Sequence, residues 1–475
     1  MHIFSQARST AGGVLFILDV LCVAAIWPIA VISGFPADGR PGALVLALYP
    51  LLHWLLLYAM GLYRRDIAAD MGRALARLPV VVGMAVALAG TLAALLSGPK
   101  GEWGAGSGPE SGHESGMLLV VLAFLGFTLA GLLARMIFRD LQRRRWLRRR
   151  LLVMGAERRA YDLLVMLRRE GRSLDYDIAF LPCPGSAEGI DPRLARDTGC
   201  RVLPLGNGTV LVAAQRLAAD MIVVAPAERR GMDLQPLLDC KKAGFPVVSY
   251  LSFIETEIRR VDLKRMELGW LIFSDGFTVG ALDRLCKRVF DLVISALVLV
   301  LSAPLLLGGM LAIRMEGRGP IFYRQERVTL DGVVFQILKL RTMRPDAEAR
   351  GAVWAAAGDS RITRAGAFLR RTRIDELPQL LNILRGEMSF VGPRPERPVF
   401  VEDLARQIPL YRERHMVKAG LTGWAQINYP YGASVNDARS KLSYDLYYVK
   451  NFSILFDFAI LSQTLREVLW PSGVR

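Results

Sequence analysis

Four apolar runs in the first third of the chain constrain its fold most strongly. They are Gly13–Ile32, Ala43–Tyr63, Leu78–Leu96 and Met117–Phe138. Each is close to the roughly 20 residues that an α-helix needs to cross a lipid bilayer. The 52% hydrophobic fraction also indicates membrane segments rather than one larger soluble core. We therefore predict a membrane protein with a four-helix transmembrane bundle over residues 1–145.

Arginine placement predicts how this bundle is oriented. The connection after the second run carries four arginines, and the fourth run is followed by seven. The connection from Gly98 to Gly116 instead carries three glutamates among glycines and serines, as expected for a flexible outer loop. Because arginine-rich connections stay on the cytoplasmic side of a membrane, both ends of the bundle are expected to face the cytosol.

A change of pattern after residue 146 predicts a parallel, Rossmann-like α/β cytosolic domain over residues 146–255. Short apolar strands alternate there with helical patterns. The predicted strands are Leu151–Met154, Ile178–Leu181, Met221–Ala225 and Pro246–Tyr250, and the predicted helices include Glu157–Glu170 and Leu234–Lys242. The turn after the first strand offers only Gly155, whereas the dinucleotide fingerprint needs three glycines. This favours a degenerate, regulatory or purely structural domain over a cofactor site. Residues 256–280 are expected to form a linker.

A fifth apolar run, Val289–Ile313, lies near the start of a C-terminal domain over residues 281–475. It is long enough to cross a bilayer, yet lysine or arginine flanks it on both sides, so crossing would violate the charge rule. Pro304, two residues after Ser302, removes a backbone hydrogen bond and permits a sharp bend. We predict a re-entrant membrane helix over residues 289–313, kinked at Ser302 and Pro304. An ordinary fifth span is the alternative.

Two adjacent carboxylates, Asp375 and Glu376, lie in a basic stretch that continues into Pro378. Pro378 is expected in the first turn of a helix, which places the carboxylates at or just before a helix N-terminus, a position that favours anions. The net charge of +16 also indicates an anionic partner. Given the membrane segments, an anionic leaflet or a phosphorylated substrate is favoured over nucleic acid. With only four histidines in the chain, carboxylates are expected to act as acid, base or nucleophile.

Several separate motifs follow one another along this C-terminal domain. They are Tyr323–Arg327, Lys339–Met343, Thr363–Arg370, Asp375–Gln379, Gly386–Pro395 and Leu421–Asn428. In these motifs the chain resembles the bacterial sugar transferase family, the polyprenyl-phosphate glycosyl-1-phosphate transferases, in the long monotopic form with added N-terminal helices. The segment Tyr429–Ser434 is most similar to the branch associated with exopolysaccharide and exosortase loci. The resemblance implies that residues 281–475 form a mixed α/β catalytic domain.

The resemblance also implies a reaction at the bacterial inner membrane, with the catalytic domain in the cytosol. Hexose 1-phosphate would move from a UDP-sugar to undecaprenyl phosphate, with release of UMP, as the first membrane step of exopolysaccharide assembly. The implied nucleophile is Asp375, which would form a covalent phosphosugar intermediate and bind Mg²⁺, while Glu376 would assist the second step. The implied substrate-binding residues are Lys339, Arg341, Arg370, Arg394 and Asp445. The lipid bilayer would be a further partner, and the oligomeric state, a homodimer included, is left open.

Each of these residues also has a plainer interpretation. Asp375 could be an ordinary helix N-cap, and Glu376 could only compensate a helix dipole. Lys339 and Arg341 could belong to the solvated face of a strand, Val333–Leu340, and Arg370 could only contact anionic lipid headgroups. His415 is expected at a surface or an interface rather than in catalysis.

Two other classes of protein compete with the transferase hypothesis. A membrane-anchored nucleotide-sugar dehydratase or epimerase would need a complete glycine fingerprint and a Tyr-x-x-x-Lys pair. None of the thirteen tyrosines has a lysine four residues later. A non-catalytic scaffold for polysaccharide assembly would show no turnover with any UDP-sugar.

Overall fold

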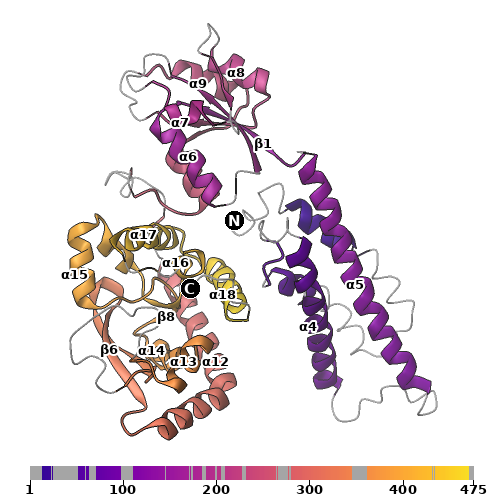
Figure 1. Cartoon of the computed structure of the whole chain (residues 1–475), viewed down its shortest axis with the longest axis vertical. Helices are drawn as coiled ribbons and strands as arrows, with labels where there is room; N and C mark the ends of the chain where they lie inside the picture. Colours follow the sequence, from indigo (N-terminus) through magenta and orange to yellow (C-terminus); the bar gives the residue numbers. More distant parts are fainter. Residues whose placement is uncertain are drawn as a thin grey trace. The chain divides into compact units, whose positions relative to one another are not determined.

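A computed structural model describes most of the chain, which divides into two compact units, Met1–Phe253 and Ile254–Arg475 (Figure 1). The described residues are 13–22, 24, 52–58, 60–63, 71–97, 111–144, 146–170, 172, 175–183, 189–197, 201–204, 209–226, 232–263, 265, 276–277, 280–344, 361–429, 432 and 434–469. Each unit is described by itself below.

The first unit begins with helices of the predicted membrane region. Two long helices are described, α4 (Met71–Ser97) and α5 (Ser111–Arg143). Residues 13–22, 24 and 52–58 are also helical and residues 60–63 form a turn, whereas the other residues of the first two apolar runs lie outside the described residues. By length and composition, no described helix of this unit qualifies as a membrane span. The four-helix bundle therefore stays a prediction. Since α5 begins at Ser111, the end of the predicted outer loop is helical instead.

A buried ion pair joins two of these helical segments. The Arg135 guanidinium in α5 lies 2.7 Å from Oδ1 of Asp19, and its second terminal nitrogen donates to Oδ2 at 3.2 Å. The two side chains are 1% and 2% exposed. Arg135 also donates to the carbonyl of Gly131 at 2.9 Å. Nothing in the hydrophobic pattern had indicated this pair.

The rest of the first unit is a parallel α/β sheet, as predicted. Its five strands have the order β3-β2-β1-β4-β5, with only parallel pairs. The strands are β1 (Arg149–Met154), β2 (Tyr176–Leu181), β3 (Arg201–Val202), β4 (Met221–Val224) and β5 (Val247–Ser249). The helices are α6 (Arg158–Arg169), α7 (Pro192–Ala195), α8 (Val210–Leu217), α9 (Gln235–Lys242) and α10 (Tyr250–Phe253). Strand β3 escaped prediction because two residues carry no periodic signal.

The second unit is built from short strands and many helices around three clusters of buried apolar side chains. Strands β6 (Phe322–Val328) and β7 (Val334–Leu340) pair antiparallel, and β8 (Ser389–Val391) and β9 (Gly420–Thr422) pair parallel. The helices are α12 (Ala281–Glu316), α13 (Arg364–Thr372), α14 (Gln379–Arg385), α15 (Pro398–Gln407), α16 (Trp424–Asn428), α17 (Val435–Lys450) and α18 (Ile454–Leu469). Two 3-10 turns, η5 (Ile374–Glu376) and η6 (Tyr411–Met416), complete the site region.

Helix α12 contains the predicted re-entrant segment and continues through Pro304. A straight helix of its 36 residues would be about 54 Å long. Its ribbon instead runs in two directions, and both arms pack on the same unit (Figure 1). The second arm packs closely on the unit at Gly309: a Cβ atom added to this glycine would lie only 3.1 Å from the side chains of both Leu340 and Leu369.

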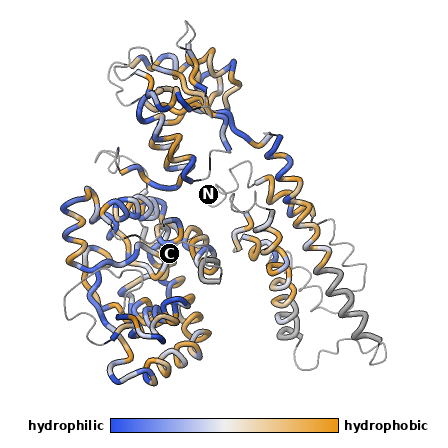
Figure 2. Tube along the Cα trace, in the orientation of Figure 1, coloured by the Kyte–Doolittle hydropathy of each residue, from blue (hydrophilic) through white to orange (hydrophobic). Residues whose placement is uncertain are grey.

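The region of α12 around Pro304 presents apolar side chains to the outside. Val300 and Leu301 are 71% and 70% exposed, and Leu305 and Leu307 are exposed as well. The hydrophobic colour accordingly predominates along this helix (Figure 2). Among the described helices, α12 is the one long and apolar enough to cross a membrane.

Candidate active site

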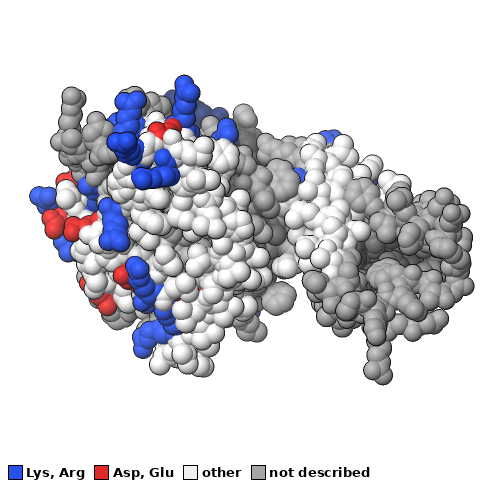
Figure 3. Space-filling view, turned by 90° about the horizontal axis from the view of Figure 1, so that it is seen from below, with Lys and Arg blue, Asp and Glu red and all other residues white. Residues whose placement is uncertain are grey.

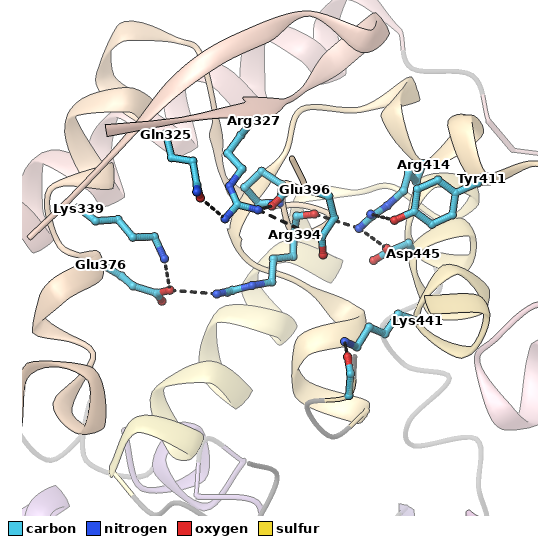
Figure 4. Close-up of polar contacts among 12 residues, drawn as sticks. Gln325, Arg327, Lys339, Glu376, Arg394, Glu396, Tyr411, Arg414, Lys441 and Asp445 are labelled. Atoms are coloured by element: carbon cyan, nitrogen blue, oxygen red, sulfur yellow. Dashed lines mark hydrogen bonds and ion pairs between the residues drawn. The ribbon is translucent and has the colours of Figure 1, made fainter. Parts of the chain in front are cut away.

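The site lies where β7, η5 and the loop after β8 meet (Figure 4). Strand β7 supplies Lys339, turn η5 supplies Asp375 and Glu376, and the loop supplies Arg394. The carboxylates precede α14, as predicted, although Pro378 is the N-cap of this helix rather than a first-turn residue. Arg373, between α13 and η5, adopts a left-handed conformation with φ of 61°, which turns the chain toward the site.

Glu376 is the centre of a group of cations. Its Oε1 accepts hydrogen bonds from Lys339 Nζ at 2.9 Å and from Arg394 at 3.2 Å. Arg373 lies 3.7 Å from Oε2. Burial alone would raise the pKa of Glu376, but Lys339, Arg394 and Arg373 outweigh it and hold the pKa well below its usual value. Glu376 is therefore an ionised group that fixes two cations in place.

Asp375 lies in the opposite electrostatic situation. It is 7% exposed, and Oδ1 has no hydrogen-bond partner among the described residues. Burial, followed by the neighbouring Glu376 charge, raises the pKa of Asp375 to about 6, against the opposing effect of Lys339 and Arg370. At neutral pH the side chain is mostly ionised, with one buried oxygen free to react or to bind a cation.

The side chains of the motif Lys339–Met343 contact different parts of the unit. Thr342 accepts a hydrogen bond at 2.8 Å from Nε of Arg370, in the last turn of α13. Arg341 instead donates to the carbonyls of Gly317 and Arg318, each at 3.3 Å. The structure thus brings Lys339 to the carboxylate pair and Arg370 near Asp375, but it does not bring Arg341 there.

Asp445 does not reach the carboxylates either, but it supports the loop that carries Arg394. It lies buried in α17, 2.7 Å from the guanidinium of Arg414. Arg414 donates to the hydroxyl of Tyr411 at 2.9 Å and to the main-chain carbonyl of Arg394 at 3.0 Å. These contacts form a chain from Asp445 to the Arg394 backbone (Figure 4).

A second arginine, Arg327 of β6, holds the same loop from the other side. It donates to the carbonyl of Pro395 at 3.1 Å and lies 3.6 Å from Glu396 (Figure 4). The motif Tyr323–Arg327 was a sequence signal for this residue, whereas Arg414 and Tyr411 lie outside the motifs. His415 was expected at a surface or an interface. The expectation of a surface position is wrong, because the side chain is buried, and this burial lowers the pKa of the imidazole to about 4.

Comparison with known proteins assigns this chain to a family. The family described as "Bacterial sugar transferase" matches residues 282–471. The UDP-glucose:undecaprenyl-phosphate glucose-1-phosphate transferase of Caulobacter vibrioides is 44% identical over 185 residues, which cover 38% of this chain and 69% of that protein. The chain belongs to the bacterial sugar transferase family. The resemblance seen in the motifs is thereby confirmed.

Two further relatives of this sugar transferase differ in the sugar that their names carry. The UDP-N-acetylgalactosamine-undecaprenyl-phosphate N-acetylgalactosaminephosphotransferase of Aeromonas hydrophila is 38% identical over 242 residues, 50% of this chain and 56% of that protein. The UDP-glucose:undecaprenyl-phosphate glucose-1-phosphate transferase of Escherichia coli is 38% identical over 189 residues, 39% of this chain and 41% of that protein. The chain thus spans about half the length of these two relatives.

Among the described residues, no group of three His, Cys, Asp or Glu side chains could form a metal site by itself. Magnesium, however, usually takes one or two carboxylates and completes its shell with water and substrate phosphates. The buried and unpartnered Oδ1 of Asp375 fits this mode of binding.

Proposed function

We propose that this sugar transferase moves a sugar 1-phosphate from a UDP-sugar to undecaprenyl phosphate and releases UMP. The observation that carries the proposal is the pair of consecutive carboxylates with opposite environments: Asp375 has a free buried oxygen, and Glu376 holds Lys339 and Arg394. The names of the relatives, which join a UDP-sugar or its sugar phosphate to undecaprenyl phosphate, support the same substrates.

In the first step, the Asp375 carboxylate attacks the β-phosphorus of the UDP-sugar. A bond forms between Oδ and phosphorus, the bond from phosphorus to the bridging oxygen breaks, and UMP leaves with that oxygen and its electron pair. In the second step, a phosphate oxygen of undecaprenyl phosphate attacks the same phosphorus and releases Asp375 as a carboxylate. The raised pKa of Asp375 supports this role, because a more basic carboxylate is a better nucleophile as long as it is ionised.

Glu376 contributes electrostatically rather than by proton transfer. Its lowered pKa keeps it ionised, so it does not act as a general acid at neutral pH. It holds the cations Lys339 and Arg394 beside Asp375. There they would stabilise the charge that develops on the phosphate oxygens and on UMP.

We further propose Asp375 as the protein ligand of Mg²⁺. The free Oδ1 and the absence of a complete metal site among the described residues support a magnesium ion that arrives with the nucleotide diphosphate. When bound, such an ion would neutralise charge on the diphosphate.

The lipid substrate places the reaction at a membrane surface, and α12 is suited to that place. Its exposed apolar side chains surround the bend near Pro304. In the view of Figure 3, an area without charged side chains is bordered by many lysine and arginine side chains and by a smaller number of acidic ones. Basic side chains beside an apolar area match anionic headgroups beside acyl chains. We therefore propose that α12 enters the cytosolic leaflet of the bacterial inner membrane and leaves it on the same side.

A vesicle assay tests this function. The purified chain is mixed with undecaprenyl phosphate, Mg²⁺ and in turn UDP-glucose, UDP-galactose, UDP-N-acetylglucosamine and UDP-N-acetylgalactosamine, and UMP release is measured. Release with at least one donor, dependent on undecaprenyl phosphate, is the expected result. No turnover with any donor would favour a scaffold instead.

A further inference from the structure

A second cluster of charged and hydroxyl side chains is buried in the same unit, and the proposed reaction does not use it. It lies among α12, α17, α18 and β8, which pack against one another. Its members are Lys287 and Asp291 of α12, Ser389 of β8, Tyr448 of α17 and Asp457 of α18. All five are buried, and Asp457 is 0% exposed.

The centre of this cluster is the ammonium group of Lys287. Nζ lies 2.6 Å from Oδ2 of Asp457 and 3.2 Å from Oδ1 of Asp291. It also donates a hydrogen bond to the carbonyl of Val391 at 3.2 Å. The hydroxyl of Tyr448 lies 3.0 Å from the same carbonyl and 2.7 Å from Oδ1 of Asp457. Two donors from different helices thus converge on one main-chain oxygen.

Asp291 holds the strand next to that oxygen. Its Oδ1 accepts a hydrogen bond from the Phe390 amide at 3.0 Å and another from the Ser389 hydroxyl at 3.0 Å. The Ser389 hydroxyl also lies 2.9 Å from the Val391 carbonyl. All three residues of β8 are therefore bound to polar side chains of the cluster.

Strand β8 leads directly to the active site. Val391 is followed by Gly392, Pro393 and Arg394, whose guanidinium binds Glu376 at 3.2 Å. The Gly392 amide donates to Thr422 and the Pro393 carbonyl accepts from Gly420, so the short path is held by main-chain bonds. A displacement of Val391 would consequently be passed on to Arg394.

The next residue of α12 holds the other part of the site. Arg288 donates to the carbonyls of Ile383 and Leu384 at 2.6 and 2.7 Å, at the C-terminal end of α14. Helix α14 follows η5, which carries Asp375 and Glu376. Lys287 and Arg288 therefore attach one turn of α12 to both elements that bear the reacting groups.

We propose that Lys287, Asp291, Tyr448 and Asp457 are positioning residues that set the place of Arg394 relative to Glu376. The inference rests on the proposed function of that site. Buried ion pairs are often no more stabilising than apolar residues of the same volume, so stability alone does not account for the cluster. Apolar packing could fill the space, but it could not fix the direction of the Val391 carbonyl. The apolar helix α12 and the active-site loop are thereby joined in one polar network.

The first test is a double-mutant cycle between the cluster and the loop. Tyr448→Phe keeps the ring and removes one hydroxyl, and it is expected to lower kcat about fivefold to tenfold, as for the loss of one buried hydrogen bond. The KM for the UDP-sugar should change much less than kcat. In an Arg394→Lys background the same substitution should have little further effect, because the group that it positions is already altered. Effects that simply multiply would overturn the proposal.

The second test does not depend on activity. Amide hydrogen exchange of the segment 388–396 is expected to be faster in Tyr448→Phe and in Lys287→Met. The matched control is Arg284→Met, which removes an exposed cation from the same helix three residues earlier. Its exchange in this segment should equal that of the wild type. Unchanged exchange in a folded Tyr448→Phe protein would refute the positioning role, whereas a wild type without turnover would refute only the proposed function.

Discussion

At the scale of single residues, the site depends on two consecutive carboxylates with opposite pKa shifts. Asp375 is buried with one oxygen unpartnered, whereas Glu376 binds three cations. A 3-10 turn makes this possible, because it has three residues per turn and its adjacent side chains point in directions about 120° apart. The sequence predicted both residues and their place before α14. It could not predict which one is paired, because that depends on Lys339 and Arg394, 36 residues before Asp375 and 18 residues after Glu376.

The pH dependence of turnover follows from these shifts. The reacting form of Asp375 is the carboxylate, and its pKa is raised to about 6. We expect kcat to rise with pH through about 6 and to level off above 7. Glu376 stays ionised over this range because its pKa is lowered. A profile with its midpoint near 4 would mean that Asp375 titrates as an ordinary exposed aspartate.

Removal of the Lys339 charge should strongly impair the reaction. Lys339→Met leaves the buried Glu376 without its nearest cation and removes a positive charge from the site. We expect kcat to fall about 100-fold to 1,000-fold, as for other groups that stabilise developing charge. The control Arg406→Met removes an exposed arginine from α15 and should leave steady-state kinetics within about twofold of the wild type. Equal losses in both variants would contradict the assignment.

At the scale of elements, four of the five strands of the parallel sheet and two of its five described helices were predicted, but the tertiary polar contacts were not. Alternating apolar and helical patterns identified β1, β2, β4 and β5 within two residues. The first three are largely buried and four to six residues long, whereas β5 is half-buried and has three residues. The pair Asp19–Arg135 joins residues 116 positions apart, and no local pattern encodes such a contact. The same holds for Arg414 and Asp445.

The Asp19–Arg135 pair should stabilise the helical region of the first unit. Asp19→Ala leaves the Arg135 guanidinium buried without its partner, which is expected to cost about 3 to 5 kcal/mol of unfolding free energy. Thermal unfolding in detergent measures the effect. Arg144→Ala, which breaks the exposed pair with Asp140, is the control and should cost less than about 1 kcal/mol. Equal melting temperatures of the two variants would contradict the expected contribution of the buried pair to stability.

At the scale of the whole molecule, the family match begins at residue 282, within the first turn of α12, and contains every residue of the proposed site. The apolar helix and the site are therefore parts of one unit. The charge rule predicted a re-entrant path for this helix from the arginines and lysines on its two sides. Both arms of α12 pack on the same unit, which is the arrangement that a re-entrant helix needs. The sequence alone could not predict this packing, because proline kinks also occur in helices that cross a membrane.

Cysteine labelling tests the re-entrant path in the native membrane. In a chain freed of its five cysteines, Arg385→Cys places a thiol on the exposed side of α14, and Ser107→Cys places one in the predicted outer loop. An impermeant thiol reagent added from the periplasmic side should label the Ser107→Cys variant only. Strong labelling of Arg385→Cys from that side would show that α12 crosses the membrane.

The most direct test of the central claim is to trap the covalent intermediate on Asp375. The protein is incubated with a radiolabelled UDP-sugar and Mg²⁺ without undecaprenyl phosphate, quenched with acid, and digested for mass spectrometry. We expect a sugar phosphate on the peptide that contains Asp375 and none in Asp375→Asn. That variant should remain folded. Because the pKa of Asp375 is raised in the folded protein, its ionised carboxylate costs stability once the pH rises from 3.8 through about 6, so a neutral Asn should stabilise the protein at pH 7.5. Turnover by the wild type without any adduct on Asp375, or full turnover by a folded Asp375→Asn protein, would contradict the account.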